Sequence, residues 1–233
     1  MVMGTSYNPR IVTDGLLVCL DPANKKSYGG SGATWTDLSG RGNDFTLSGV
    51  TFTENGGASY FEFGDNEGDY AYRSNTDIMS GLNTYTIDMW ILLTTLQSQI
   101  AFVSYATPGG GDNAFLIFKS GNNLSMPYGV GGTTVSDSFY NTGNWINFVG
   151  TRNVTDGKFY FDGAHTHSYT AGTGSAAGSG GSLVIGQEQD SVGGGFATTQ
   201  DMPGYLGLFK IYNRALTADE VRQNYLATKE RYA

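Results

Sequence analysis

The chain has 233 residues and a formal net charge of −8, with 35 glycines, 13% aromatic residues and only 15% charged residues. The acidic balance excludes a typical nucleic-acid groove, because phosphate binding needs a basic stripe and the 13 Lys and Arg residues do not cluster beyond Lys25 and Lys26. No stretch approaches the ~20 apolar residues of a transmembrane helix, so we expect no membrane span. Abundant glycine with few charges is typical of short strands joined by tight turns.

Apolar runs of strand length recur along the chain between clusters of turn residues. Residues 60–63 and 159–161 alternate in polarity, as half-buried antiparallel strands do. Short apolar runs separated by regularly spaced turn residues predict a β-sandwich. In chain order the predicted strands are 15–20, 45–52, 59–63, 70–73, 85–94, 100–105, 114–119, 145–152, 157–162, 182–186 and 205–212.

Only the C-terminus carries a helix signature. Thr217 and Glu220 form a capping box, which predicts a helix from 218 to about 231 with Val221, Tyr225 and Leu226 on its apolar stripe. The elements together predict an all-β sandwich of two antiparallel sheets with one short C-terminal helix. We divide the chain into an N-terminal arm, 1–14, and a single domain, 15–233.

Two loops carry the oxygen-bearing side chains that calcium prefers. Asp112 and Asn113 follow a run of glycines between two predicted strands, and residues 186–190 (Gly-Gln-Glu-Gln-Asp) leave another strand, with Gln200 shortly after. Calcium takes about six to eight oxygen ligands from carboxylates, amides and carbonyls. Taken separately, each cluster is more often a solvated loop than a metal site.

The sequence around the second loop resembles a known family. Residues 183–221, reading LVIGQEQDSVGGGFATTQDMPGYLGLFKIYNRALTADEV, closely resemble the pentraxin segment that runs from the calcium loop to the final helix. Upstream, 104–107 (SYAT), Asp112-Asn113 and 115–118 (FLIF) resemble the stretch that holds the other calcium ligands of that family. The resemblance covers roughly 85–225 and implies a concanavalin A-like jelly-roll sandwich.

The resemblance also implies a set of Ca²⁺ ligands. A second calcium ion would share Glu188 and Asp190 and add Gln200, but Ala197 stands where the family has an acidic ligand. Because losing a carboxylate weakens a calcium site, we expect one good site and a second that is weak or empty. The ligands implied for the first ion are Asp112, Asn113, Glu188, the backbone carbonyl of Gln189, and Asp190.

Ligand recognition is implied in the same way. In pentraxins an acidic group of the ligand bridges to calcium while an apolar pocket holds the rest. Phe118 matches the pocket aromatic, whereas Thr134 stands where the family has the glutamate that recognises the ammonium of choline. Tyr128 is an aromatic that could stack on a sugar. Phosphocholine is therefore disfavoured, and we expect a glycan or another phosphate- or carboxylate-bearing ligand.

The opening of the chain resembles a different group of proteins. Residues 20–24 (LDPAN) and 34–44 (TWTDLSGRGND) resemble the start of laminin-G-like domains common in bacteriophage virion proteins and bacterial surface proteins. This resemblance implies a virion protein made in the host cytoplasm, with other virion proteins as partners and a homo-oligomer as an open possibility. A bacterial cell surface is the alternative location.

Three functions follow from these patterns. The leading hypothesis is a calcium-dependent lectin-like binding module displayed on a phage virion. The alternative is a structural capsid-decoration or fibre protein in which calcium only stabilises a loop. A glycan hydrolase is the lesser alternative, since the Glu-x-Asp-x-x-Glu run of sandwich hydrolases does not occur. We therefore expect no enzyme activity.

Overall fold

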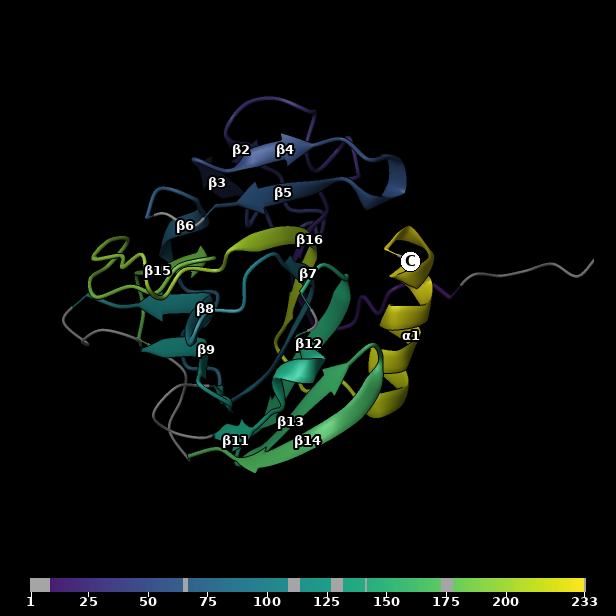
Figure 1. The fold of residues 1–233 in the computed structure, drawn as a ribbon, viewed down its shortest axis with the longest axis vertical. Helices are drawn as coiled ribbons and strands as arrows, with labels where there is room; N and C mark the ends of the chain where they lie inside the picture. Colours follow the sequence, from purple (N-terminus) through teal and green to yellow (C-terminus); the bar gives the residue numbers. More distant parts are fainter. Residues whose placement is uncertain are drawn as a thin grey trace, which may run out of the picture.

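The computed structural model describes residues 9–64, 67–108, 114–126, 132–140, 142–172 and 178–232. Within these ranges the chain forms two antiparallel β-sheets that pack face to face, and one α-helix lies outside them (Figure 1). The predicted all-β sandwich with a short C-terminal helix is confirmed. None of the helices in the described ranges has the length and apolar character needed to cross a membrane.

The first sheet is built around its longest strands. It comprises β1 (Leu16–Leu20), β4 (Thr51–Thr53), β5 (Tyr60–Phe63), β7 (Thr84–Leu93), β12 (Ile146–Asn153), β13 (Asp156–Phe161), β14 (Ala164–Thr170) and β16 (Gly204–Tyr212). Their order is β14-β13-β12-β7-β16-β5-β4, and β1 also pairs with β16. Strand β16 therefore pairs with β7 on one side and with β5 and β1 in succession on the other.

The second sheet carries the loops that concern function. It comprises β2 (Thr34–Trp35), β3 (Phe45–Ser48), β6 (Tyr70–Thr76), β8 (Gln99–Ala106), β9 (Phe115–Ser120), β10 (Asn123–Ser125), β11 (Gly132–Thr134) and β15 (Gly181–Ile185). Their order is β11-β10-β9-β8-β15-β6-β3-β2. Neighbours far apart in sequence, such as β15 between β8 and β6, make this sheet a product of long-range pairing.

The main core fills the space between the two sheets. Trp35 of the second sheet meets Phe61 of the first with ring centroids 4.9 Å apart, and Tyr85 meets Phe115 at 5.4 Å, both edge to face. All four residues are fully buried. Aromatic side chains supply large buried areas, and edge-to-face pairs add to that burial, so these contacts hold the sheets together.

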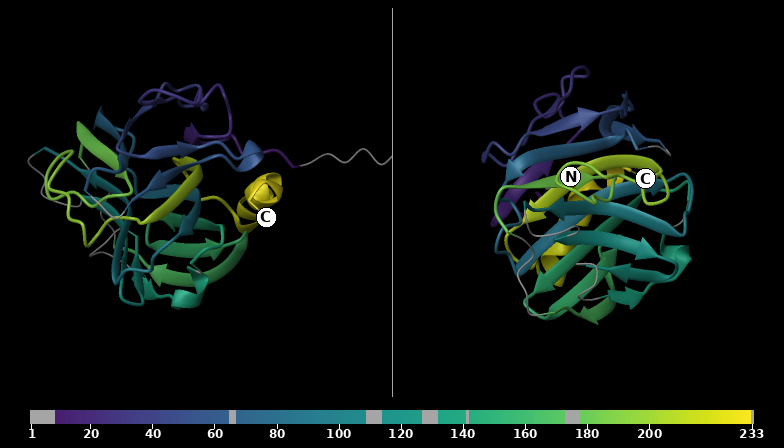
Figure 2. Two further views of the ribbon diagram at one scale, coloured as in Figure 1. Left: turned by 45° about the horizontal axis from the view of Figure 1, so that its top comes forward. Right: turned by 90° about the vertical axis from the view of Figure 1, so that its left-hand side faces the viewer.

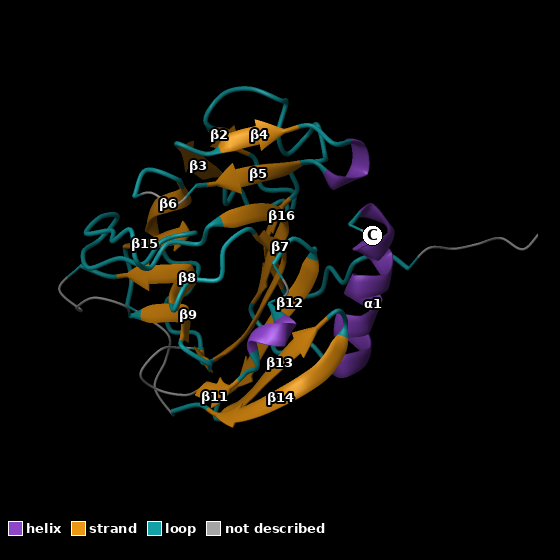
Figure 3. Ribbon diagram, viewed as in Figure 1, coloured by secondary structure: helices purple, strands orange, loops and turns teal. Residues whose placement is uncertain are grey.

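Helix α1 (Ala218–Thr228) packs on the outer face of the first sheet and continues as a 3₁₀ turn, Lys229–Arg231 (Figures 1 and 3). The predicted capping box is present, with Thr217 as N-cap. The predicted stripe is only partly right, because Val221 is buried while Tyr225 and Leu226 are half-buried. Asn224 is buried instead, since its amide donates to the carboxylate of Asp88 at 3.0 Å. The hydrogen bond to Asp88 on the sheet thus helps to determine which face of α1 is buried.

One predicted strand was wrong. Residues 45–52 form two strands, β3 in the second sheet and β4 in the first. Gly49 has a φ of 67°, and a side chain there would collide with Asp69. Glycine adopts this left-handed conformation without steric cost, so the chain turns at this residue and crosses from one sheet to the other. The remaining short helical turns are Gly56–Ala58 and Asp137–Phe139.

Candidate functional site

The candidate site is the long loop that follows β15. Gly186 ends the strand with a φ of 91°, and a side chain at this position would collide with the ring of Phe63. A residue with a Cβ would therefore disturb both the turn and the core beneath it. The loop lies at the left of Figure 1, on the side turned to the viewer in the right panel of Figure 2.

The side chain of Gln189 holds the loop against the sheet. Its Nε2 donates to Ser104 Oγ at 2.9 Å and to the carbonyl of Ser182 at 3.1 Å, while its Oε1 accepts from the amide of Gly193 at 2.8 Å. Gln189 is fully buried. Since its side-chain amide is engaged inside the protein, the role of the Gln189 carbonyl as a calcium ligand stays a prediction.

These bonds turn the loop back along the outer face of the second sheet. Ser182 lies at the start of β15 and pairs with Ala106, the last residue of β8. The loop therefore returns to the end of the sheet from which the connection between β8 and β9 departs. Asp112 and Asn113 belong to that connection but lie outside the described residues, so their part in the site stays a prediction.

Two carboxylates of this loop are buried. Glu188 is 3% exposed and Asp201 is 1% exposed, whereas Asp190 is exposed to solvent. Burying a carboxylate is costly unless hydrogen-bond donors or a cation compensate for the lost water. Asp201 was not predicted as a site residue, although an acidic side chain directly after Gln200 in the same loop is a signal that the sequence contains.

The base of the loop is tied to the sheet by main-chain bonds. The amide of Ala101 donates to the carbonyl of Gln200 at 2.8 Å, and the amide of Met202 donates to the carbonyl of Gly186 at 3.0 Å. The start and the end of the loop are therefore joined directly. Gln200, half-buried, is held against β8, the neighbour of strand β15 from which the loop with Glu188 departs.

The position of Asp190 depends on a tight glycine turn. Ser191 and Gly194 exchange two main-chain hydrogen bonds of 3.1 Å, which closes the chain into a narrow hairpin. Gly195 follows with a φ of 73°, and a Cβ there would lie 2.7 Å from the Cβ of Asp190. The absence of a side chain at Gly195 is therefore required for the placement of Asp190.

The donors that the structure describes are chemically suited to calcium. The carboxylates of Glu188 and Asp190, the carbonyl of Gln189 and the amide of Gln200 all offer oxygen, which is what a hard cation prefers. Ala197 offers no side-chain oxygen to a second ion. Within the described ranges, however, no three His, Cys, Asp or Glu side chains gather closely enough to hold a metal. A complete first site thus requires ligands from outside those ranges.

The three predicted ligand-binding residues are not assembled around the loop. Phe118 is 3% exposed and packs with Ala101 and Leu116 in a small apolar cluster, so little of its ring is accessible. Thr134 is exposed on β11, which lies four strands from β15, a separation of about 19 Å at the usual strand spacing. Tyr128 lies outside the described residues. Ligand contacts by these residues stay predictions.

Comparison with known sequences agrees with the architecture. The model of the concanavalin A-like lectin/glucanases superfamily matches residues 55–222. Human neuronal pentraxin-1 is 30% identical to this chain over 163 residues, which cover 65% of this chain and 36% of that protein. The chain thus spans about a third of that relative's length. The predicted relationship to pentraxins is confirmed.

Solved structures share the fold at low sequence identity. The binding domain of Paraclostridial Mosquitocidal Protein 1 superposes with a TM-score of 0.64 and 18% identity, covering 91% of this chain and 52% of that one. Trypanosoma rangeli sialidase in complex with sialic acid superposes with a TM-score of 0.66 and 14% identity, covering 97% of this chain and 36% of that one. These similarities establish the fold alone.

Proposed function

Because the chain belongs to the concanavalin A-like lectin/glucanases superfamily, we propose that it is a non-catalytic binding module whose ligand is a carbohydrate or another oxyanion. A calcium ion held by the loop after β15 assists this binding. The ion would neutralise the loop carboxylates and present open coordination positions to oxygen atoms of the ligand. The proposal rests on one observation, the anchoring of Gln189.

The anchoring matters because it arranges donors rather than only closing a loop. With the Gln189 amide engaged by Ser104 and Ser182, Glu188 and Asp190 flank a residue that is fixed to the sheet. Ligands fixed in advance reduce the entropic cost of binding. Glu188, Gln189 and Asp190 are the residues that would hold calcium, together with Asp112 and Asn113.

The comparisons support a lectin-like binding role, without specifying the ligand or calcium. Pentraxins are the relatives in sequence, and a toxin binding domain has the same fold. The similarity to a sialidase concerns the fold alone at 14% identity, so it carries no catalytic assignment. A panel of β-glucans and sialosides tests the non-catalytic part of the proposal, and release of reducing sugar or sialic acid would contradict it.

Calcium binding is tested by calorimetric titration of the chelator-treated protein. Asp190→Ala is expected to lose most of the heat of binding, because it removes an exposed carboxylate from the proposed ion. Asp219→Ala is the matched control, since it removes an exposed carboxylate from the first turn of α1. No heat with the parent protein, or equal heat in both variants, would contradict the proposal.

A structural role for the ion is the second candidate, favoured by the deep burial of Glu188 and Gln189. In that case calcium stiffens the loop of a capsid-decoration or fibre protein. A glycan array screened with and without calcium separates the two. Calcium-dependent glycan signals support the binding module. A higher melting temperature with calcium, without any glycan signal, supports the structural role. Display on a phage virion stays a prediction from the opening segment.

A further inference from the structure

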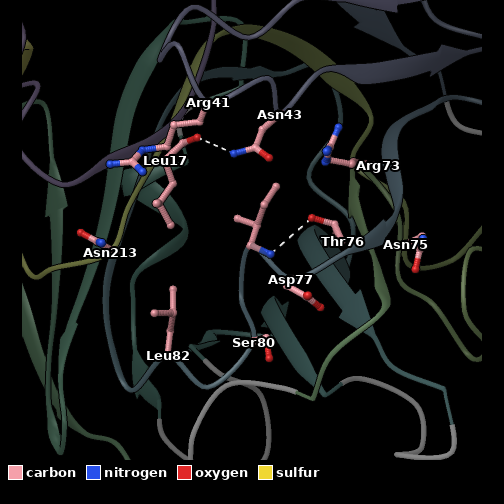
Figure 4. A pocket seen from close by; sticks show the side chains of 11 residues that line it. Leu17, Arg41, Asn43, Arg73, Asn75, Thr76, Asp77, Ser80, Leu82 and Asn213 are labelled. Atoms are coloured by element: carbon pink, nitrogen blue, oxygen red, sulfur yellow. Dashed lines mark hydrogen bonds between the residues drawn. The ribbon is translucent and has the colours of Figure 1, made fainter.

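A polar pocket opens between the sheets at one end of the sandwich (Figure 4). Its volume is about 400 Å³, within the range of roughly 300–1,000 Å³ that is usual for small-molecule sites. Its walls come from β1, from the end of β6 with the turn that follows, from the loop before β3 and from the residue after β16. The residues that shape it include Leu17, Arg41, Asn43, Arg73, Thr76 and Asp77.

Two guanidinium groups line this pocket without a carboxylate partner. Arg41 Nε donates to the carbonyl of Leu16 at 2.8 Å, and Arg73 Nη1 donates to the carbonyl of Asp44 at 3.0 Å. Among the described residues, no carboxylate comes within 4.0 Å of either group, although acidic residues outnumber basic ones 21 to 13. Each guanidinium has five N–H donors, so most of this hydrogen-bonding capacity stays available.

The rest of the wall is rich in amide and hydroxyl groups. Asn43 lies between the two arginines in Figure 4, and its amide nitrogen donates to the carbonyl of Leu17 at 2.8 Å. Asn75, Ser80 and Asn213 also line the pocket. Polar side chains of this kind recognise hydroxyl groups, whereas the few apolar residues would meet only one face of a ligand.

The lower wall is held in place by hydrogen bonds. The hydroxyl of Tyr105 donates to the carbonyl of Thr76 at 2.6 Å, and the amide of Gly180 donates to Asp77 Oδ1 at 2.7 Å. The amide of Ile78 donates to Thr76 Oγ1 at 3.3 Å, as drawn in Figure 4. The turn is thus formed before any ligand arrives, which lowers the cost of ordering it on binding.

The geometry points to a second binding site, for an acidic saccharide whose carboxylate pairs with Arg73 or Arg41 and whose hydroxyl groups meet the surrounding amides and hydroxyls. Guanidinium groups bind carboxylates through strong, directional hydrogen bonds. Asp77 is the only acidic residue among the described residues that line the pocket, so the two arginines give that lining a net positive charge in an acidic protein.

The pocket is independent of the proposed calcium site. Arg73 pairs with Leu183 across β6 and β15, and Leu183 belongs to the main core. Paired residues share a face of the sheet, so Arg73 points between the sheets. Val184 is adjacent to Leu183 and points to the opposite face, and its cross-strand partner Ser104 carries there the hydroxyl that Gln189 contacts. The second sheet therefore separates the two sites, and the pocket needs no calcium.

The test is a calorimetric titration with oligogalacturonate at low ionic strength in excess chelator, with neutral malto-oligosaccharide and sodium sulfate as comparison ligands. We expect binding of oligogalacturonate alone. Arg73→Gln and Arg41→Gln are each expected to weaken it about tenfold or more, as the loss of a charge-assisted hydrogen bond implies. Arg222→Gln removes an exposed charge from α1 and is expected to leave the affinity unchanged.

Asp77→Asn is a second test, because it is expected to raise the affinity and a poorly folded variant would not. Its amide oxygen can still accept from Gly180, while the negative charge on the wall is gone, so acidic-saccharide affinity is expected to rise about threefold. Absence of binding in the parent protein overturns the site. Equal losses in Arg41→Gln and Arg222→Gln overturn it as well. If the parent protein binds the saccharide with calcium present but not in excess chelator, the saccharide is assigned to the loop after β15 instead.

Discussion

The carboxylate of Asp88 lies 2.7 Å from the ammonium group of Lys210, and neither side chain is exposed to solvent. The two residues are direct partners on β7 and β16. The amides of Asn147 and Asn224 both donate to the same carboxylate, at 2.9 and 3.0 Å. A buried ion pair within the first sheet, covered by helix α1, is thus fully surrounded by protein.

Breaking this pair is expected to destabilise the fold strongly. Asp88→Asn leaves the ammonium of Lys210 buried without a counter-charge, and loss of one partner of a buried pair costs about 3–5 kcal/mol. Urea denaturation measures the free energy of unfolding. Asp14→Asn is the control, since Asp14 pairs with Arg214 but is 86% exposed, and surface pairs contribute about 0–1 kcal/mol. Equal losses in both variants would contradict the prediction.

Gly195 is expected to control calcium affinity through the position of Asp190. Gly195→Ala introduces a Cβ 2.7 Å from the Cβ of Asp190, so the carboxylate must move, and we expect the dissociation constant for calcium to rise about tenfold, as for loss of one good ligand contact. Gly121→Ala is matched to it, because Gly121 also has a positive φ, of 55°, but faces open space. Calorimetry that finds the same affinity in both variants would rule out this role.

The capping box of α1 is expected to make stability depend on acid pH. Hydrogen bonds from Arg214 lower the pKa of Glu220 from 4.5 to about 2. Since the folded pKa is depressed, the stabilisation is fully present above pH 4.5 and is lost as the pH falls toward 2. Glu220→Gln is expected to cost about 1 kcal/mol at pH 7, because the pair is partly exposed, and almost nothing at pH 2. A pH-independent difference between the two unfolding curves would disprove this.

Cys19 is expected to be inert in the folded protein. Burial raises the pKa of its thiol to about 12, and the thiolate is the reactive form. Iodoacetamide at pH 8 should therefore leave the native chain unmodified by mass spectrometry, while the same reagent in urea should alkylate it fully. Rapid modification without denaturant would show that β1 opens readily.

Local patterns in the sequence predicted most of the elements. Alternation in residues such as 60–63 and the capping box at Thr217 depend on neighbours within a few positions, so the periodicity alone reveals them. The split of the predicted strand 45–52 was missed, because the apolar run gives no sign that Gly49 sends the chain into the other sheet. Short strands such as β10 and β11 were missed for lack of a periodic pattern.

The candidate site was predicted in part. The residue types at Glu188, Gln189 and Asp190 were visible in the sequence and led to the calcium hypothesis. The buried carboxylate of Asp201 was overlooked, and the distance of Thr134 from the loop could not be foreseen. Strand order decides that distance, and no local pattern encodes which strands become neighbours.

By itself, the sequence determined the all-β class, the single capped helix and the oxygen-rich character of the loop after residue 185, since each depends on residues close together in the chain. The tertiary structure alone decided that Asp88 faces Lys210 and Asn224, and that Arg41 and Arg73 line one pocket. Those relationships join residues distant in sequence, whose meeting depends on how two sheets pair and pack as a whole.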